Sequence, residues 1–373
     1  MSGFIQDPIQ FVNLIADNLR DRYQTGFPVL KELIQNTDDA PATELHYGLS
    51  PGLKESSHPL LHGPGLFLIN NGAFKPSDAR GIRSFGQNSK AAEQSSIGKF
   101  GLGMKSVFHF CETFFFLAHD GDKAHAEVLN PWSGPDSMQS LHRDWDTFTD
   151  QDARLIRGHL SGITGKISKT SEQCFILWLP LRMKAHLDLP SDERAGAIVS
   201  EYPGDDRSLL DFLHEETLGV KVAALLPMLR NLSRTAFWQL GETSEVTNPV
   251  FDVSLGGGAS RPSLIESLQE EADTEAVHRN EIKGRIRISG DQGSQLLEFR
   301  GYEHYGWTPA LTTMHGHELW PSSYVRDDLG HSREVKDKAQ PHGAVFFSRT
   351  PGAGRLTANW SVFLPLDEMH ASE

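Results

Sequence analysis

The sequence is poor in the features that assign a protein to a class at once. Its 373 residues include 2 cysteines, Cys111 and Cys174, which form no C-x-x-C pair, so neither a zinc cage nor a disulfide framework is indicated. No apolar run approaches the roughly 20 residues of a membrane-spanning helix, and the first residues do not follow the pattern of a signal peptide. We therefore expect a protein of a reducing, cytoplasmic compartment with no membrane partner.

Positive charge is also scarce. The chain has 35 Lys and Arg against 49 Asp and Glu, a formal net charge of -14, so binding of nucleic acid by the whole surface is possible but unsupported by charge. One local exception lies between Lys75 and Lys105, where basic residues outnumber acidic ones. A patch of this kind can still bind phosphate.

The length allows two domains, because domains usually hold about 100 to 200 residues each. Between Pro190 and Asp206 the composition shifts to proline, glycine and acidic residues, which indicates a boundary. We expect one domain over residues 1–190 and a second over residues 205–373.

Hydrophobic periodicity predicts the main elements. An amphipathic helix is expected in "IQFVNLIADNLRDRY", and a second one between Pro28 and Pro41. Residues 75–97 are read as a mobile loop that leads into a glycine turn and a helix. Strands are expected in "GLFLINN", "TFFFLAH" and "SEQCFILWLPLR", in the alternating runs at 251–255 and 282–288, and in the final antiparallel pair "HGAVFFSRT" and "LTANWSVFLPLDE". A helical segment is expected in "SLLDFLHEETLGVKVAALLPMLRNL".

The second expected helix, in "KELIQNTDDAP", carries Glu32, Asn36 and Asp39 on one face at spacings i, i+4 and i+7. Taken alone, this stripe is more often a solvated face than a site. A solvated helix face usually mixes both signs of charge, whereas this one holds only acids and an amide, which suits a hydrated magnesium ion.

A glycine turn, "GKFGLG", contains Gly98, Gly101 and Gly103. Its order is neither that of a dinucleotide fingerprint nor that of a Walker A loop. Side-chain-free residues before a helix let backbone N–H groups approach an anion at the positive end of that helix, although many such turns are purely structural.

The order of three sequence runs along the chain is informative: "ELIQNTDDA", then "FLINNGAF", then "SSIGKFGLGMKSVFHF". Together they resemble the nucleotide-binding boxes of the GHKL ATPase superfamily, which includes gyrase, the large heat-shock chaperones, histidine kinases and MutL. The branch that they resemble most is that of sacsin and its bacterial relatives. The resemblance covers about residues 10–182, and it continues weakly to the end of the chain.

The resemblance implies an α/β (α+β) two-layer sandwich of the Bergerat type, with helices on one face of a mixed sheet, followed by a smaller α+β transducer-like domain. It also implies a chaperone-like conformational switch that binds ATP with Mg²⁺ and hydrolyses it slowly. A lid over about residues 75–97 would close on ATP, and a protein partner or a second protomer, as a homodimer, would then dock.

The resemblance also assigns roles to individual residues. Glu32 would be the general base for the attacking water, Asn36 the Mg²⁺ ligand, and Asp39 the support of that helix face and of the nucleotide edge. Asn70 stands in the place of the aspartate that reads adenine. The implied nucleotide-binding residues are Asn36, Asp39, Asn70, Gly72, Lys90, Gly98, Lys99, Phe100, Gly101, Leu102, Gly103, Lys105 and Cys174.

The sequence does not decide which cation contacts the phosphates. Lys105 and Lys90 are the candidates, and the alternative for each is a solvated surface residue. A cation from the second domain reaches the terminal phosphate in relatives, and the candidates here are Arg349, Lys336 and Arg355.

Three positions depart from the family pattern. Asn70 lacks the charge of an aspartate, Phe74 replaces a glycine, and Cys174 replaces a threonine that often backs the adenine pocket. They keep a second hypothesis open: a nucleotide-gated binding or scaffold module with little hydrolysis, of the kind associated with bacterial defence systems.

Two further motifs contain residue types that can form sites. "MHGHELW", with His315, His317 and Glu318, has potential metal ligands but no supporting cluster. "LHEETLG", with His214 and Glu215, faintly resembles the phosphoacceptor box of histidine kinases, yet it follows the ATPase boxes instead of preceding them.

Overall fold

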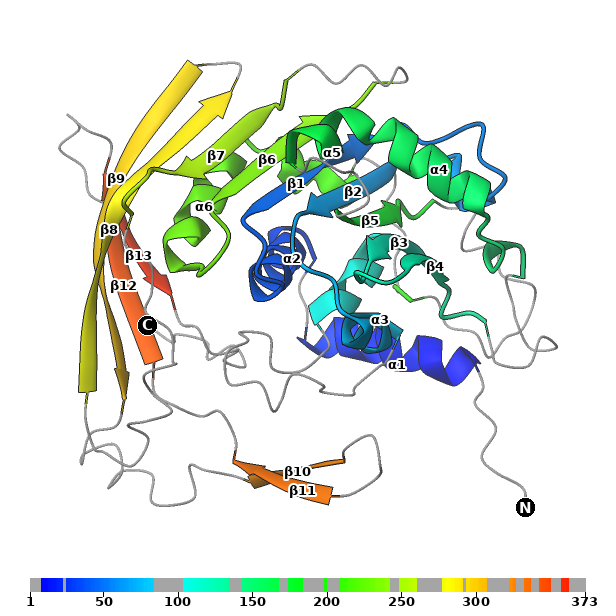
Figure 1. Ribbon diagram of the computed structural model, residues 1–373, viewed down its shortest axis with the longest axis horizontal. Coiled ribbons are helices and arrows are strands. Elements are labelled where there is room, and N and C mark those ends of the chain that lie inside the picture. Colours follow the sequence, from blue (N-terminus) through cyan, green and yellow to red (C-terminus); the bar gives the residue numbers. More distant parts are fainter. Residues whose placement is uncertain are drawn as a thin grey trace.

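The computed structural model has mixed α/β architecture built on one large, mostly antiparallel sheet (Figure 1). It describes residues 8–22, 25–83, 103–133, 143–167, 174–183, 198–199, 208–241, 248–259, 277–290, 293–306, 322–326, 332–336, 342–349 and 357–361. Within these ranges, eleven strands form the sheet in the order β13-β12-β9-β8-β7-β6-β1-β2-β5-β3-β4.

One end of the sheet is formed by strands from the first half of the chain. These strands are β1 (Glu44–Ser50), β2 (Gly65–Asn70), β3 (Phe114–His119), β4 (Ala124–Leu129) and β5 (Phe175–Pro180). The expected strands in "GLFLINN", "TFFFLAH" and "FILWLPLR" are confirmed as β2, β3 and β5.

The second half of the chain extends the same sheet. Its strands are β6 (Arg234–Gln239), β7 (Phe251–Leu255), β8 (Val277–Gly290), β9 (Gly293–Gly306), β12 (His342–Arg349) and β13 (Thr357–Ser361), while β10 (Ser322–Arg326) and β11 (Ser332–Lys336) form a separate hairpin. β6 pairs in parallel with β1, so the sheet runs without a break from the first half of the chain into the second. The division into domains at 190 and 205 stays a prediction.

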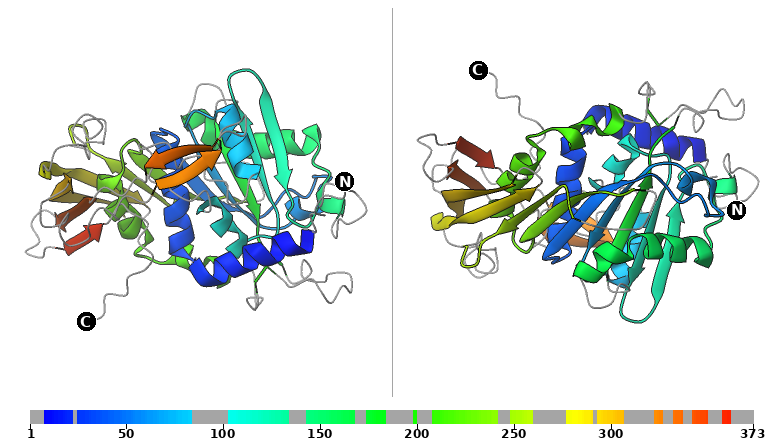
Figure 2. Two further views of the ribbon diagram at one scale, coloured as in Figure 1. Left: turned by 90° about the horizontal axis from the view of Figure 1, so that it is seen from below. Right: turned by 90° about the horizontal axis from the view of Figure 1, so that it is seen from above.

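Helices lie on both faces of the strands from the first half of the chain (Figure 1), which differs from the expected two-layer sandwich. α1 (Pro8–Arg22), α2 (Phe27–Asp39) and α3 (Pro76–Arg83) lie on one side, and α4 (Asp150–His159) and α5 (Ser161–Ile167) on the other (Figure 2). The reason is visible in β2, whose six residues are all buried, because a strand that is apolar on both faces must be covered on both.

Short helices complete the fold. The 3-10 helices are η1 (Pro59–Leu61), η2 (Gly103–His109), η3 (Arg143–Trp145), η6 (Ser208–His214) and η7 (Leu226–Met228), and α6 is Leu218–Leu225. The helix expected after the glycine turn is therefore a 3-10 helix, η2. Among the described residues, no helix combines the length and apolar character that a membrane span requires.

The start of the expected lid is helical, so the loop prediction is wrong for its first residues. α3 begins with Pro76, and the side chain of Asp78 accepts a hydrogen bond from the backbone N–H of Lys75 at 2.8 Å. This arrangement caps the first turn and explains why a polar, aperiodic run can form a helix there. Residues 84–97 of the expected lid lie outside the described residues.

Candidate functional site

α2 places the predicted acid and amide stripe beside the sheet. It begins after Gly26 with Pro28 in its first turn, as the sequence predicts, and it buries Leu30 and Ile34 while Glu32 stays half-buried. Burial raises the pKa of Glu32 above its ordinary 4.5; the charge of Lys31 opposes this shift, and Asp39 adds to it. A carboxylate whose pKa is moved toward neutrality is a better proton acceptor for general-base chemistry.

Asn36, one turn further along α2, has an unsatisfied side chain. Its amide nitrogen Nδ2 is buried and has no hydrogen-bond partner among the residues that the structure describes. Buried polar atoms are nearly always paired, so such an atom indicates a site for a ligand. A phosphate oxygen or a metal-bound water would supply the missing acceptor.

The C-terminal turn of α2 is held by residues that follow the expected domain boundary. The carboxylate of Asp38 is fully buried and accepts backbone N–H bonds from Arg230, Asn231 and Leu232 at 3.0, 2.7 and 2.8 Å. Asp39 accepts a hydrogen bond from the Arg230 guanidinium at 2.8 Å, and its side chain is 0% exposed. Asp39 is thus an ion-pair partner in this structure, whether or not it also supports a nucleotide.

The end of β2 lies against the end of α2. Asn70 is the last residue of β2, is buried, and pairs across the sheet with Leu45 at the start of β1. A Cβ at Gly72 would stand 2.4 Å from the carbonyl oxygen of Ala40, so only glycine fits where the two elements touch. The structure therefore brings Asn70 and Gly72 close to the C-terminal end of the helix that carries Glu32, Asn36 and Asp39.

The side chain of Asn70 is already engaged. Its Oδ1 accepts a hydrogen bond from the backbone N–H of Gly72 at 3.0 Å, closing a local turn. An amide oxygen has two lone pairs, so Oδ1 can accept a second hydrogen bond.

Cys174 and Phe74 flank the same strand end. Cys174 is buried directly before β5, whose Phe175 pairs with Asn70, and burial raises the pKa of its thiol to about 11. Phe74 stacks on Phe175 with ring centroids 5.7 Å apart and lies 5.9 Å from the ring of Phe116. The residue in the place of the family glycine therefore covers the sheet with an aromatic ring.

η2 brings Lys105 into the interior next to α2. Lys105 is 5% exposed, and its Nζ donates a hydrogen bond to the carbonyl oxygen of Ile82 near the end of α3. Burial lowers the pKa of Lys105 to about 8. The alternative of a solvated surface cation is therefore wrong for Lys105, while contact with phosphate stays a prediction.

Arg182 fixes the other end of η2. Its guanidinium is fully buried, forms an ion pair with Glu112, and donates to the backbone carbonyls of Phe108, His109 and Cys111. These carbonyls lie at the C-terminal end of η2, where backbone acceptors have no partner within the helix. Arg182 thus positions the helix that follows the glycine turn.

Comparison with known proteins supplies the family. The chain matches the family described as the Sacsin domain over residues 10–245. The protein belongs to the Sacsin domain family. It is 36% identical to human sacsin over 251 residues, which are 63% of this chain and 5% of sacsin. The chain therefore spans only a small part of the length of that relative.

The Sacsin-domain match extends past residue 190. It includes Arg230 and β6, which contact α2 and β1, as well as the site residues predicted from the sequence. The matched region thus agrees with the continuity of the sheet across the expected linker.

Several predicted residues cannot be placed. The structure describes Gly103, at the start of η2, but the other members of the glycine turn and its neighbours lie outside the described residues: Lys90, Gly98, Lys99, Phe100, Gly101 and Leu102. His315, His317, Glu318 and Arg355 also lie outside them. Of the remaining cation candidates, Lys336 ends β11, and Arg349 is exposed on β12, paired with Glu298 at 3.1 Å.

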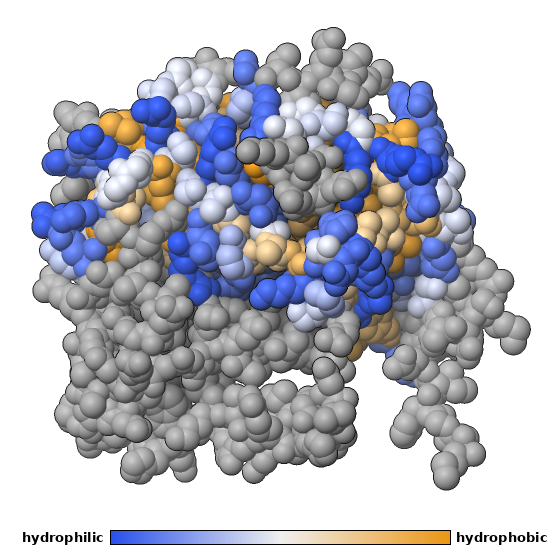
Figure 3. Space-filling view, in the orientation of Figure 1, coloured by the Kyte–Doolittle hydropathy of each residue, from blue (hydrophilic) through white to orange (hydrophobic). Residues whose placement is uncertain are grey.

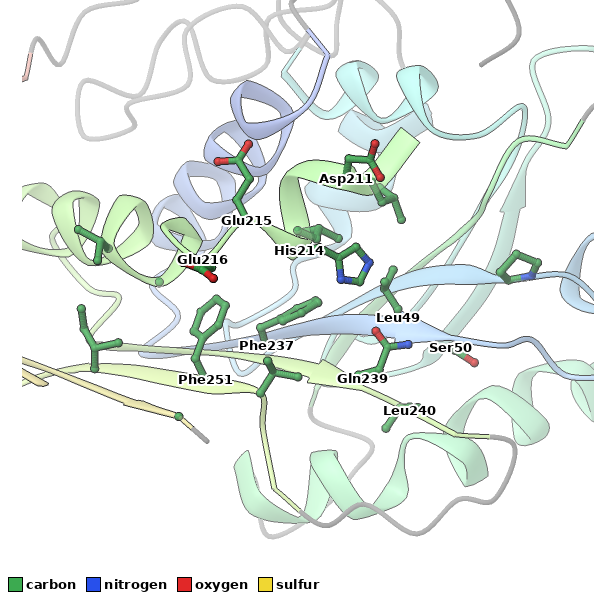
Figure 4. Close-up of a pocket in the computed structure, with 18 of the residues that line it drawn as sticks. Leu49, Ser50, Asp211, His214, Glu215, Glu216, Phe237, Gln239, Leu240 and Phe251 are labelled. Carbon is green, nitrogen blue, oxygen red and sulfur yellow. The ribbon is translucent and has the colours of Figure 1, made fainter. Parts of the chain in front are cut away.

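A cavity of about 1140 Å³ opens at the opposite end of β1 from Asn70 (Figure 4). Leu49 and Ser50 at the end of β1, Phe237 of β6 and Phe251 of β7 line it beneath His214 and Glu216. In the sheet, Ser50 pairs with Gly65 and Leu45 pairs with Asn70, so the length of β1 separates this cavity from the predicted nucleotide site. The two are different places on the protein.

The roles of Asp38, Arg230 and Arg182 were not predicted from the sequence. Asp38 follows Leu30 and Ile34 at helical spacing, so a charged residue within the apolar stripe was a usable signal for a buried carboxylate. Arg230 carries no local signal, because its partners lie 191 and 192 residues away.

Proposed function

We propose that this Sacsin domain binds ATP with Mg²⁺ between α2, the end of β2 and η2, and hydrolyses it slowly as a conformational switch. The observation that carries the proposal is the buried amide nitrogen of Asn36, a hydrogen-bond donor that lacks a partner among the described residues and would suit a phosphate oxygen or a metal-bound water. The family resemblance makes the same side chain the Mg²⁺ ligand, a role that its Oδ1 would fill. The neighbouring Glu32, with its raised pKa, supports a water-activating role on the same helix.

Each side chain then has a defined task. Glu32 orients the attacking water and accepts its proton, Asn36 holds the metal and phosphate end, and Asn70 offers its amide to the base. The Arg230 ion pair keeps Asp39 and the last turn of α2 in place. The backbone of the glycine turn, which ends at Gly103, would surround the phosphates.

The metal would need most of its ligands from outside the protein. In the described part of the chain, no group of three or more His, Cys, Asp or Glu residues could hold a metal ion. Mg²⁺ commonly keeps several waters and binds through one or two protein oxygens together with substrate phosphates, which fits a site that offers Asn36. When bound, it would neutralise charge on the phosphates.

The contacts that hold α2 in place suggest how nucleotide binding could change the conformation of the protein. Because α2 is tied to the segment before β6 through Asp38 and Arg230, a change at the nucleotide can be passed to the second half of the sheet. We propose that ATP closes the lid region and favours docking of a protein partner or a second protomer, and that hydrolysis reverses this.

A second candidate function is a nucleotide-gated scaffold with little hydrolysis. It is favoured by the engagement of Asn70 with Gly72 and by the Phe74 ring stacked on Phe175, which alter the place where the base is read. The two candidate functions differ in one expectation: only the ATPase requires Glu32 for its rate of ATP hydrolysis.

Replacing Asn36 with alanine tests nucleotide and metal binding. Hydrogen bonds to charged groups contribute about 1.5–3 kcal/mol, so we expect roughly ten- to a hundredfold weaker binding of Mg-ATP by isothermal titration calorimetry. The difference between binding with Mg²⁺ and binding with excess EDTA should also shrink. Asn13→Ala, on the exposed face of α1, is the matched control and should bind like the wild type. Unchanged Mg-ATP affinity in Asn36→Ala would contradict the proposal.

The protonation of Lys105 provides a test of whether its side chain faces the phosphates of ATP. Its pKa of about 8 lies below the ordinary 10.5, so its buried ammonium group costs stability at neutral pH, and stability should rise as pH increases between these values. A nearby triphosphate favours the ammonium form, so ATP binding at about pH 8.5 should take up protons. Titration calorimetry in buffers of different ionisation enthalpy measures this uptake.

The uptake should vanish in Lys105→Met and persist in Lys123→Met, which removes an exposed lysine. Equal proton uptake in all three proteins would show that Lys105 does not face the phosphates.

A further inference from the structure

The outer face of β8, β9 and β12 gathers positive charge on an otherwise acidic protein. In β8, Ile282 and Ile286 are buried on one face, so the odd-numbered residues between them point to the other. Cross-strand pairing places further residues of β9 and β12 on that outer face. We call it the basic sheet face, defined by Lys283, Arg285, Arg287, Leu296, Arg300, Phe347 and Arg349, together with Glu281 and Glu298.

The cations of the basic sheet face remain accessible. The side chains of Lys283, Arg285, Arg300 and Arg349 are 63%, 66%, 69% and 59% exposed. In Figure 3 the upper left, over β8 and β9, shows strongly hydrophilic side chains interrupted by hydrophobic ones. A ligand can therefore reach these groups without a change in the fold.

The charges on this face do not balance. Glu281 is shared by Lys283 and Arg300 at 3.0 and 2.6 Å, and Glu298 is shared by Arg285 and Arg349 at 3.5 and 3.1 Å. With Arg287, also exposed, five cations stand against two carboxylates, although the whole chain has a net charge of -14. Exposed ion pairs contribute little free energy, so these arginines can exchange a carboxylate for a ligand anion at small cost.

Exposed apolar side chains lie among the cations. Phe347 is 43% exposed and pairs across the strands with Arg300, and Leu296 is 37% exposed and pairs with Arg287. An exposed ring beside guanidinium groups on a sheet can stack an unpaired base while the cations bind phosphates. Neither an acidic peptide nor a duplex needs such a ring.

We propose that the basic sheet face binds single-stranded nucleic acid. Arg285, Arg287 and Arg300 would contact the phosphates, and Phe347 would stack on a base. The acidic remainder of the surface would repel the strand elsewhere and confine it to this face. This inference does not depend on the proposed ATPase activity.

The test measures binding of fluorescein-labelled oligothymidylate and oligouridylate of about 20 nucleotides to the full chain by fluorescence anisotropy over a salt series. The variant Arg285→Ala/Arg287→Ala/Arg300→Ala should bind more than tenfold more weakly, and the slope of log affinity against log salt should fall by about 2. Phe347→Ala should bind about fivefold more weakly or worse with an unchanged slope, since stacking is not electrostatic.

The matched control, Arg20→Ala/Lys123→Ala/Arg154→Ala, removes the same charge from exposed positions elsewhere and should keep more than half of the affinity. Circular dichroism should show equal folding of all variants. Equal losses in both triple variants would overturn the proposal. So would binding of polyglutamate, or of vesicles rich in phosphatidylserine, by a chain that does not bind the oligonucleotides.

Discussion

Glu32→Gln is expected to lower the rate of ATP hydrolysis by about two to four orders of magnitude while leaving ATP affinity within about twofold. Glutamine keeps the size of the side chain and can still orient a water, but it cannot accept the proton of that water. Since Glu32 is held half-buried on α2, the substitution should not move the helix. Phosphate release under steady-state conditions and calorimetric binding of ATP measure the two quantities.

The pH dependence of hydrolysis is an independent test of the role of Glu32. Because burial raises the pKa of Glu32, the acidic limb of the rate profile should lie above pH 4.5 and should be missing from the residual activity of Glu32→Gln. The folded state holds this proton more tightly than the unfolded state, so the contribution of Glu32 to stability falls as pH rises through its folded pKa. Glu32→Gln should therefore be as stable as the wild type at neutral pH, or slightly more so, in urea unfolding.

Asp17→Asn is the matched control, since it neutralises an exposed carboxylate on α1 and should leave both measurements unchanged. If the wild type and Glu32→Gln show the same background rate while both bind ATP tightly, the enzyme proposal is wrong and the scaffold candidate is favoured.

Arg182→Met is expected to lower the free energy of unfolding by about 3–5 kcal/mol. The change leaves the carboxylate of Glu112, which is 0% exposed, buried without its counter-charge. It also removes the donors for the carbonyls at the end of η2. Urea unfolding followed by tryptophan fluorescence measures the loss, and Arg154→Met, at an exposed position on α4, should change stability by less than about 0.5 kcal/mol.

The double variant Glu112→Gln/Arg182→Met separates charge from packing. The glutamine keeps an acceptor for Trp132 Nε1 and removes the buried charge, so the double variant should be more stable than Arg182→Met alone. If the double variant is less stable than Arg182→Met, the loss comes from packing, and the stabilising role assigned to the ion pair is wrong.

The sequence predicted local structure well where a single segment determines it. Pro28 lies in the first turn of α2 and Pro41 follows its last residue, as expected, and the unbroken apolar runs of β2, β3 and β5 predicted strands in the right places. It failed where the outcome depends on distant partners. Helices on both faces of the sheet and the parallel pairing of β6 with β1 follow from contacts between segments that no local pattern encodes.

The candidate site divides in the same way. Spacing alone was enough to place Glu32, Asn36 and Asp39 on one helix. The order of the three family-like sequence runs then predicted that Asn70 and Gly72 lie near that helix. The burial of Lys105 could not be predicted, because it depends on the position of Ile82 in a stretch read as a loop. The ion pair between Asp39 and Arg230 could not be predicted for the same reason, because the two residues lie 191 positions apart.

The bonds from Asp38 to residues 230–232 also constrain how the protein is made. These contacts join groups as much as 194 residues apart, and β1 has no parallel neighbour until β6 has been translated. Long-range pairing slows folding and leaves apolar surface exposed on the growing chain. We therefore expect α2 to wait on the ribosome for its native surroundings until β6, which ends at Gln239, has emerged.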